Sequence, residues 1–187
     1  MRGLSSLKGL GKLKGLQGLG GGSSYIPALE DKQPKLETGQ EDPLVMEIWR
    51  VMGGKGNQLK VARQAAKLQV KLPYATTPEL LVYLWLKEKG IPFEFQAEAN
   101  GGRRSTGGSV IDFLCRPGPV WACRIQGTFW HNIPEQQRMD EVRKKLLEGQ
   151  FVMGFQIDGV VDIWEQRVYQ DREDTMTLAM SGIQLGQ

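Results

Sequence analysis

The residues of this 187-residue chain best suited to chemistry lie in two stretches that read as adjacent buried strands. The first stretch, predicted over 109–115, carries a single carboxylate at Asp112. The second, predicted over 120–126 after a Pro-Gly-Pro turn, carries Arg124 and Gln126, which share one face of the strand because they are two residues apart. Polar side chains inside otherwise apolar strands make these strands the first candidates for a functional site.

These two strands, with the Gly-Thr-Phe-Trp-His segment at 127–131, resemble the metal-site hairpin of the PD-(D/E)xK nucleases. Within that superfamily they look most similar to the very-short-patch mismatch endonucleases and their small relatives. The resemblance implies one or two Mg²⁺ ions bound by hard oxygen ligands, which activate water and neutralise charge on a phosphate. By resemblance, Asp112 matches the first ligand, Ile125 the main-chain carbonyl position, and Gln126 the Lys or Gln that contacts the attacking water. Glu79, within Thr-Pro-Glu-Leu, matches a helix carboxylate beside the metal.

Arg124 departs from the family pattern, because it falls where the second acidic ligand belongs. We expect its guanidinium to pair with Asp112, since Arg–Asp pairing is a ready arrangement. Two unit charges near 4 Å interact by about 4 kcal/mol at an effective dielectric of 20, so this cation would compete with Mg²⁺. Two alternatives stay open. Glu79 and Asp112 could hold one metal by themselves, or the strand register could differ by one residue, which would exchange the faces.

Other polar residues near this hairpin have two readings each. Lys144 and Lys145, on a predicted helix, could supply a migrated catalytic lysine or form the exposed side of that helix. His131 is the only histidine of the chain, and we favour a structural role for it over a catalytic one. Arg103 and Arg104 lie in a glycine-rich loop over 100–108 and would suit phosphate contact, although a plain surface loop explains them equally well.

The elements that must position these residues follow from caps and periodicity. Thr76, Pro78 and Glu79 form a strong helix start, and the helix should run to Lys89 and end at Gly90. Alternation of apolar and polar residues predicts a strand over 93–98. The order continues with the two strands above, a helix over 134–148, a strand over 151–157 and a further candidate strand over 160–164. This order predicts an α/β protein with a mixed sheet, in the αβββαβ arrangement of the restriction-endonuclease-like core.

The N-terminal part differs from the rest in composition. Residues 1–22 form a triplet repeat with leucine at every third position, and we expect this Gly/Leu-rich arm to be extended rather than helical. Residues 23–43 form a polar linker, 44–72 a basic helical segment and 73–187 the nuclease-like domain. Residues 1–72 carry a net charge of +6 and residues 73–187 a net charge of −3. Lys60, Arg63 and Lys67 lie along one face of a helix predicted over 57–70, which could contact a phosphate backbone or form a solvated face.

These observations favour a nuclease-fold protein that has lost catalysis and serves as a structural or nucleic-acid-binding part of a larger assembly, such as a phage or virus particle. The alternatives are an active Mg²⁺-dependent DNA endonuclease and a protein-interaction module without nucleic acid. We expect DNA and other protein subunits as partners and no cofactor, or Mg²⁺ if the protein is active. Two buried cysteines, the lack of an apolar run of about 20 residues and the lack of a signal-peptide core predict an intracellular or virion protein without a membrane span.

Overall fold

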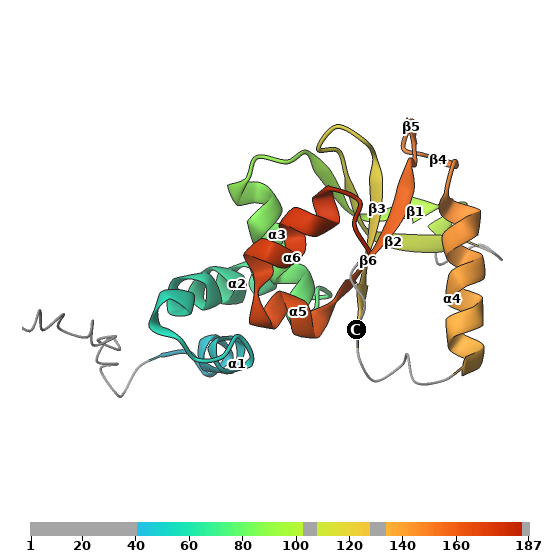
Figure 1. Ribbon diagram of the computed structural model, residues 1–187. Helices are drawn as coiled ribbons and strands as arrows, with labels where there is room; N and C mark the ends of the chain where they lie inside the picture. The colour runs from blue at the N-terminus through green and yellow to red at the C-terminus, as the bar shows by residue number, and fades with distance from the viewer. Residues whose placement is uncertain (1–40, 103–107, 128–133, 185–187) are drawn as a thin grey trace, which may run out of the picture. The chain divides into compact units, whose positions relative to one another are not determined.

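A mixed four-stranded sheet organises the protein (Figure 1). Its strands are β1 (Phe93–Ala99), β2 (Ser109–Cys115), β3 (Trp121–Gln126) and β6 (Gly159–Trp164), in that spatial order. The first three strands form an antiparallel meander, and β6 pairs in parallel with β3. The α/β class and the mixed sheet are therefore confirmed.

The computed structural model describes residues 41–102, 108–127 and 134–184, with the side chains of 134–137 left aside. These residues belong to one compact unit that spans 33–187. The predictions for the arm 1–22, for the linker up to residue 40, and for Arg103, Arg104 and His131 fall outside the described residues.

Six α-helices accompany the sheet in the described part of the chain, and a short 3-10 turn, Gly56–Gln58, precedes the second of them. The helices are α1 (Pro43–Val51), α2 (Leu59–Lys71), α3 (Thr77–Glu88), α4 (Pro134–Leu147), α5 (Glu165–Gln170) and α6 (Arg172–Met180). Figure 1 shows α3, α5 and α6 on one side of the sheet and α4 on the other. No helix among the described residues is long and apolar enough to cross a bilayer.

Helix α3 begins as its sequence predicts. Thr76 and Glu79 form a reciprocal capping box, proline occupies the first turn, and Gly90 at φ +66° follows the helix end. The helix buries Leu80, Leu81 and Leu86 completely. It thereby becomes the central element of the larger apolar cluster, which also takes in α1 and α2 and one face of β3 and β6.

Two apolar clusters lie on the two sides of the sheet. The larger one contains Cys123 of β3 and Ile163 of β6 together with α3, whereas the smaller one contains Ala122 and Val160 together with Leu147 of α4. Alternate residues of a strand point to opposite faces, so Arg124 and Asp162, two residues beyond Ala122 and Val160, share the α4 side. The cysteines Cys115 and Cys123 are free and fully buried, as expected for small core residues.

The alternation breaks at the centre of the β1–β2 hairpin. Phe95 pairs with Phe113 and Ala97 pairs with Ile111, and the register skips the two residues between them, Gln96 and Asp112. Gln96 has φ +52°, a conformation that L residues rarely adopt within a strand. Phe95 and Phe113 belong to the cluster around α3, and Ala97 and Ile111 belong to the cluster around Leu147. A local distortion of this kind re-aims a side chain, and here the re-aimed side chain is Asp112.

The C-terminal part differs from the prediction in two ways. The strand expected over 151–157 is instead a separate hairpin of β4 (Phe151–Val152) and β5 (Phe155–Gln156), closed by Met153 and Gly154 at positive φ. The strand that completes the main sheet is β6, which was only a further candidate. Helices α5 and α6 were not predicted, because their sequences are largely polar and short; they bury only Val168, Thr175, Met176 and Ala179.

Candidate functional site

Glu79 is a buried carboxylate in the first turn of α3, with 7% of its surface exposed. Its Oε2 accepts hydrogen bonds from the Thr76 backbone N–H at 2.5 Å and from the Thr76 hydroxyl at 2.7 Å. These bonds satisfy the start of the helix, and the negative charge is favourable at a helix N-terminus. Glu79 therefore has a structural role through Oε2, and the two capping hydrogen bonds do not use Oε1.

Asp112 meets Glu79 from the centre of β2. Its Oδ2 accepts a hydrogen bond from the Ile125 backbone N–H at 2.6 Å, just past the point where the β2–β3 pairing ends at Phe113 and Cys123. The carboxyl group of Glu79 lies close enough to that of Asp112 to raise its pKa. The structure thus brings together the two residues that were expected to bind a metal, and we call them the carboxyl pair.

The carboxyl pair holds a proton more tightly than an isolated aspartate does. Burial is the main reason that the pKa of Asp112 rises to about 6, and the nearby Glu79 raises it further. The hydrogen bond from Ile125 acts in the opposite direction, as does the more distant positive charge of Arg124. Two carboxyl groups in contact favour either a shared proton or a bound cation, because both cannot ionise freely in a partly dry site.

The expected ion pair between Arg124 and Asp112 is not the one that forms. The guanidinium of Arg124 instead binds Asp162 of β6, with Nε at 2.8 Å and a terminal nitrogen at 2.6 Å from Oδ1. The reason is the sheet order: Arg124 and Asp162 are direct neighbours in the parallel β3–β6 ladder and share the α4 face. Arg124 is therefore already paired, and it acts on Asp112 only as a weak distant charge.

Asp162 is the centre of a larger group of polar side chains, which we call the ionic cluster. Its carboxylate also accepts from Gln126 Nε2 at 2.8 Å and lies 3.5 Å from Lys144 Nζ of α4. Arg124 donates in addition to the Asp140 main-chain carbonyl of the same helix, at 3.5 Å. All of these side chains are at least partly buried, so the cluster attaches α4 to the sheet. Lys145, by contrast, is exposed.

The structure offers fewer metal ligands than the resemblance to the nuclease family implies. The described residues contain no group of three or more His, Cys, Asp or Glu side chains arranged to hold a metal ion. The carboxyl pair offers two carboxylates, and Gln126, expected beside the attacking water, is bound to Asp162. Magnesium keeps several waters and needs only one or two carboxylates, but the resemblance implies a second acid on β3, and Arg124 stands at that position.

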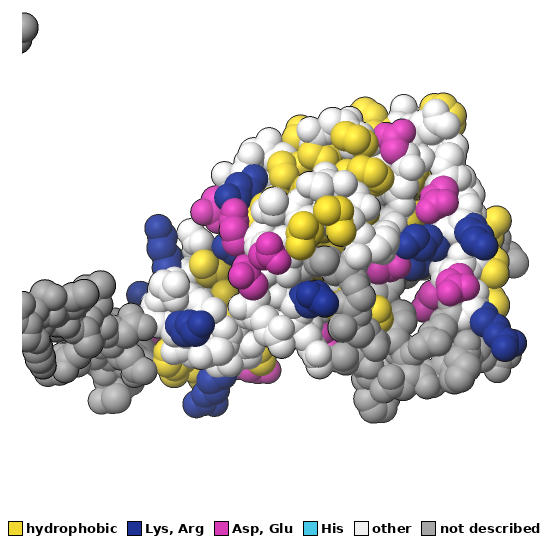
Figure 2. Space-filling view, in the orientation of Figure 1, with side chains coloured by type: hydrophobic (Ala, Val, Ile, Leu, Met, Phe, Trp, Pro, Cys, Tyr) yellow, Lys and Arg dark blue, Asp and Glu magenta, His cyan; other side chains and the backbone are white. Residues whose placement is uncertain are grey.

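The predicted basic residues of α2 lie on its solvent side. Lys60, Arg63 and Lys67 are exposed, whereas Ala62 and Ala65 are fully buried against the neighbouring helices. Arg63 forms an ion pair with Glu41, just before α1. Figure 2 shows Lys and Arg side chains distributed over the α1–α2 end of the protein.

Asp162 is the residue of this region that sequence reasoning missed. It is the single charged residue in the apolar run of β6, as Asp112 is in β2: Val-Val-Asp-Ile repeats the pattern of Val-Ile-Asp-Phe. That pattern was a usable signal for a buried carboxylate that needs a partner. The sequence could not show that the partner is Arg124, because this depends on the parallel pairing of β6 with β3.

Comparison with known proteins found no relative: no family model, no curated protein and no solved structure matches the chain.

Proposed function

We propose that the protein is a nucleic-acid-binding component of a larger assembly, built on a restriction-endonuclease-like core that does not catalyse cleavage. One observation carries this proposal. The position expected to hold the second metal-binding acid is Arg124, and Arg124 is held by Asp162 in a partly buried ion pair. A cation bound in this way supplies neither a metal ligand nor a base.

The exposed face of α2 supports the nucleic-acid part of the proposal. The helix carries Lys60, Arg63, Lys67 and Lys71 and no carboxylate over its 13 residues. Rows of cations of this kind bind phosphate backbones by releasing condensed counterions, largely without reading sequence. The expected ligand is therefore DNA or another nucleic acid, recognised through its phosphates.

The outer side of α4 supports the assembly part of the proposal. Met139, Val142 and Leu146 follow one side of the helix, and each is at least half exposed. Figure 2 shows hydrophobic side chains at the edge of the protein where α4 lies. Exposed apolar side chains gathered on one helix face are typical of protein interfaces. We place the assembly in the cell interior or in a virus particle.

A Mg²⁺-dependent endonuclease is the second candidate, and the carboxyl pair favours it. Because Arg124 is paired with Asp162, no described cation forms an ion pair with Glu79 or Asp112, and a divalent ion between them would balance their charge. Such an ion would be held by these two carboxylates, and when bound it would supply an activated water for attack on a phosphodiester.

Plasmid cleavage and gel retention separate the two candidates. The full chain and its Asp112→Ala variant would be incubated with supercoiled plasmid and with short single- and double-stranded DNA, in Mg²⁺ and then in Mn²⁺. We expect no cutting and a salt-sensitive retention of DNA by both proteins. Cutting by the natural chain that disappears in the variant would establish the endonuclease instead. If the chain neither cuts DNA nor retains it at low salt, both candidates are refuted.

A further inference from the structure

We propose that the groove between α2 and α3, together with the turn after α2, binds a single strand of nucleic acid. This inference rests on the proposed nucleic-acid binding and specifies where the ligand lies and which form it takes. An unpaired base would lie on the apolar floor of the groove, and the adjoining phosphates would meet the lysines at its rim.

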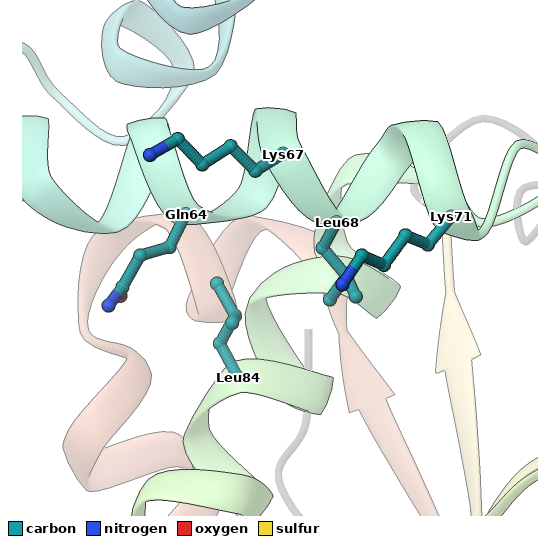
Figure 3. A pocket seen from close by; sticks show the side chains of 5 residues that line it. All are labelled: Gln64, Lys67, Leu68, Lys71 and Leu84. Atoms are coloured by element: carbon teal, nitrogen blue, oxygen red, sulfur yellow. The ribbon is translucent and has the colours of Figure 1, made fainter.

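The groove is an open depression of about 240 Å³ along the contact between the two helices. Figure 3 shows Gln64 and Leu68 directed from α2 toward α3, and Leu84 directed from α3 toward α2. Lys67 and Lys71 extend from α2 beside them. The groove therefore combines a floor of two leucines with two ammonium groups and one amide, which could meet an apolar ring face, two phosphates and a base edge.

The two lysines of the groove are available to a ligand. Among the described residues, neither Lys67 nor Lys71 takes part in an ion pair, whereas Arg63 on the same helix is paired with Glu41. Lys67 and Lys71 are four residues apart, so they are on one side of α2 and about 6 Å apart along its axis. Two cations that form no described ion pair thus lie on one side of the C-terminal half of α2.

An aromatic side chain stands exposed next to this charge. Tyr74, in the turn that follows α2, is 87% exposed, and Val70 in the last turn of the helix is 83% exposed. The turn is well held: the Gln69 side-chain amide donates to the carbonyl oxygens of Leu72, Pro73 and Ala75. A large ring kept in solvent by an ordered turn can receive a stacked base without further rearrangement.

The apolar features decide between a duplex and a single strand. A duplex presents phosphates to a protein and keeps its base faces stacked inside, so a row of lysines alone would suffice to bind it. Exposed rings and apolar floors are useful only where base faces are free, as in single strands, loops and ends. The groove and Tyr74 together therefore indicate an unpaired strand.

The test measures binding of fluorescein-labelled oligonucleotides by anisotropy, with the full chain, over a range of salt concentrations. The ligands are a thymine-rich single strand, a duplex of the same length and, as a different class, a synthetic peptide of alternating Leu and Glu. The variants are Lys67→Gln with Lys71→Gln, and separately Tyr74→Ala. The matched control is Arg138→Gln with Arg143→Gln, which removes two exposed charges from α4. Circular dichroism verifies that each variant is folded.

We expect the single strand to bind more tightly than the duplex. The lysine variant should bind it at least ~10-fold more weakly, with a salt slope smaller by about 1.4 for two lost phosphate contacts. Tyr74→Ala should weaken binding by about 10-fold through lost stacking, and the control should bind like the natural chain.

The following results would overturn the inference, and they differ in whether the proposed nucleic-acid binding survives. Equal single-strand binding by all variants, or a preference for the duplex, would remove the groove as the site but keep the proposed function. Binding of the acidic peptide without binding of the oligonucleotides would assign the groove to a protein ligand. Absence of any oligonucleotide binding at low salt would refute the proposed function and this inference together.

Discussion

The carboxyl pair and the ionic cluster lie close together in the sheet, yet they solve the problem of partly buried charge in opposite ways. Glu79 and Asp112 are two acids in contact, and burial raises the pKa of Asp112 to about 6. In the ionic cluster, one carboxylate at Asp162 meets Arg124, Lys144 and Gln126. Opposite charges satisfy one another within the protein, whereas like charges need a proton or an external cation.

This difference assigns separate roles to two regions that the sequence placed in a single site. In the ionic cluster the carboxylate of Asp162 is paired with two cations, and we infer that the cluster serves to hold α4 on the sheet. The carboxyl pair is incomplete, and any residual metal chemistry of the protein would have to begin there. Four predictions test this division, from the largest expected effect to the smallest.

Replacing Asp162 by Ala should have the largest effect. The change leaves Arg124 and Lys144 without their carboxylate in a partly buried place, and we expect the free energy of unfolding to fall by about 3 kcal/mol. Urea unfolding followed by circular dichroism measures it. As a control, the double change Arg124→Met with Asp162→Leu should be less destabilising, because it leaves only the more exposed Lys144 without its carboxylate. A loss below about 1 kcal/mol for Asp162→Ala would show that the cluster does not support the fold.

The carboxyl pair should make stability fall as pH rises. The pKa of Asp112 is raised from 3.8 to about 6 in the folded protein, so between these values the folded state binds more protons than the unfolded state. Linkage then requires the free energy of unfolding to decrease with rising pH, by about 2 kcal/mol from pH 4.5 to 7. Asp112→Asn should abolish this contribution while its side-chain oxygen still accepts from Ile125. An unchanged slope in the variant would mean that another group titrates.

Glu79→Gln should have a smaller, stabilising effect near neutral pH. Glutamine still fits a capping box, so the start of α3 stays intact, but the like charge beside Asp112 is removed. We expect a gain below about 1 kcal/mol at pH 7 and a shift of the titration of Asp112 to lower pH. Stability measured across pH 4.5–7 in this variant tests both points. A loss of stability at every pH would indicate that Glu79 acts through its cap alone.

Arg143→Ala should have the smallest effect. Arg143 pairs with Asp140 on α4 at 3.4 Å, but its side chain is 56% exposed, and surface ion pairs contribute little. We expect a change within about 0.5 kcal/mol in the same unfolding measurement. A larger loss would show that charge on the outer part of α4 matters as much as the partly buried cluster beneath it.

Much of the fold was predictable because it depends on local physics. Thr76 and Glu79 cap α3, the alanines of α2 alternate with cations at helical spacing, and the apolar runs around Asp112 and Arg124 form the predicted strands. The resemblance to the nuclease hairpin also placed Glu79 and Asp112 in one candidate site. The hairpin of β4 and β5 was mistaken for a strand of the sheet, because a short apolar run does not reveal whether it turns back on itself.

The orientation of α4 was not predictable, because it depends on what the helix meets. Its charges have the spacing of a solvated face, yet Lys144 lies against Asp162, and Val142 and Leu146 are exposed. The sheet beneath it presents Arg124 and Asp162 on that side, so the helix turns polar groups inward to satisfy them. Hydrophobic periodicity alone would have turned the other face inward.

The sequence by itself determined the start of α3, the segments of β1, β2 and β3, the carboxylate in β2 and the concentration of positive charge on α2, because caps, periodicity and composition act over a few residues. Only the tertiary structure decided the partner of Arg124, the contact between Glu79 and Asp112, and the groove beside Lys67. Those contacts join residues that are distant in the chain, and they depend on β6 pairing with β3 and on α2 packing against α3.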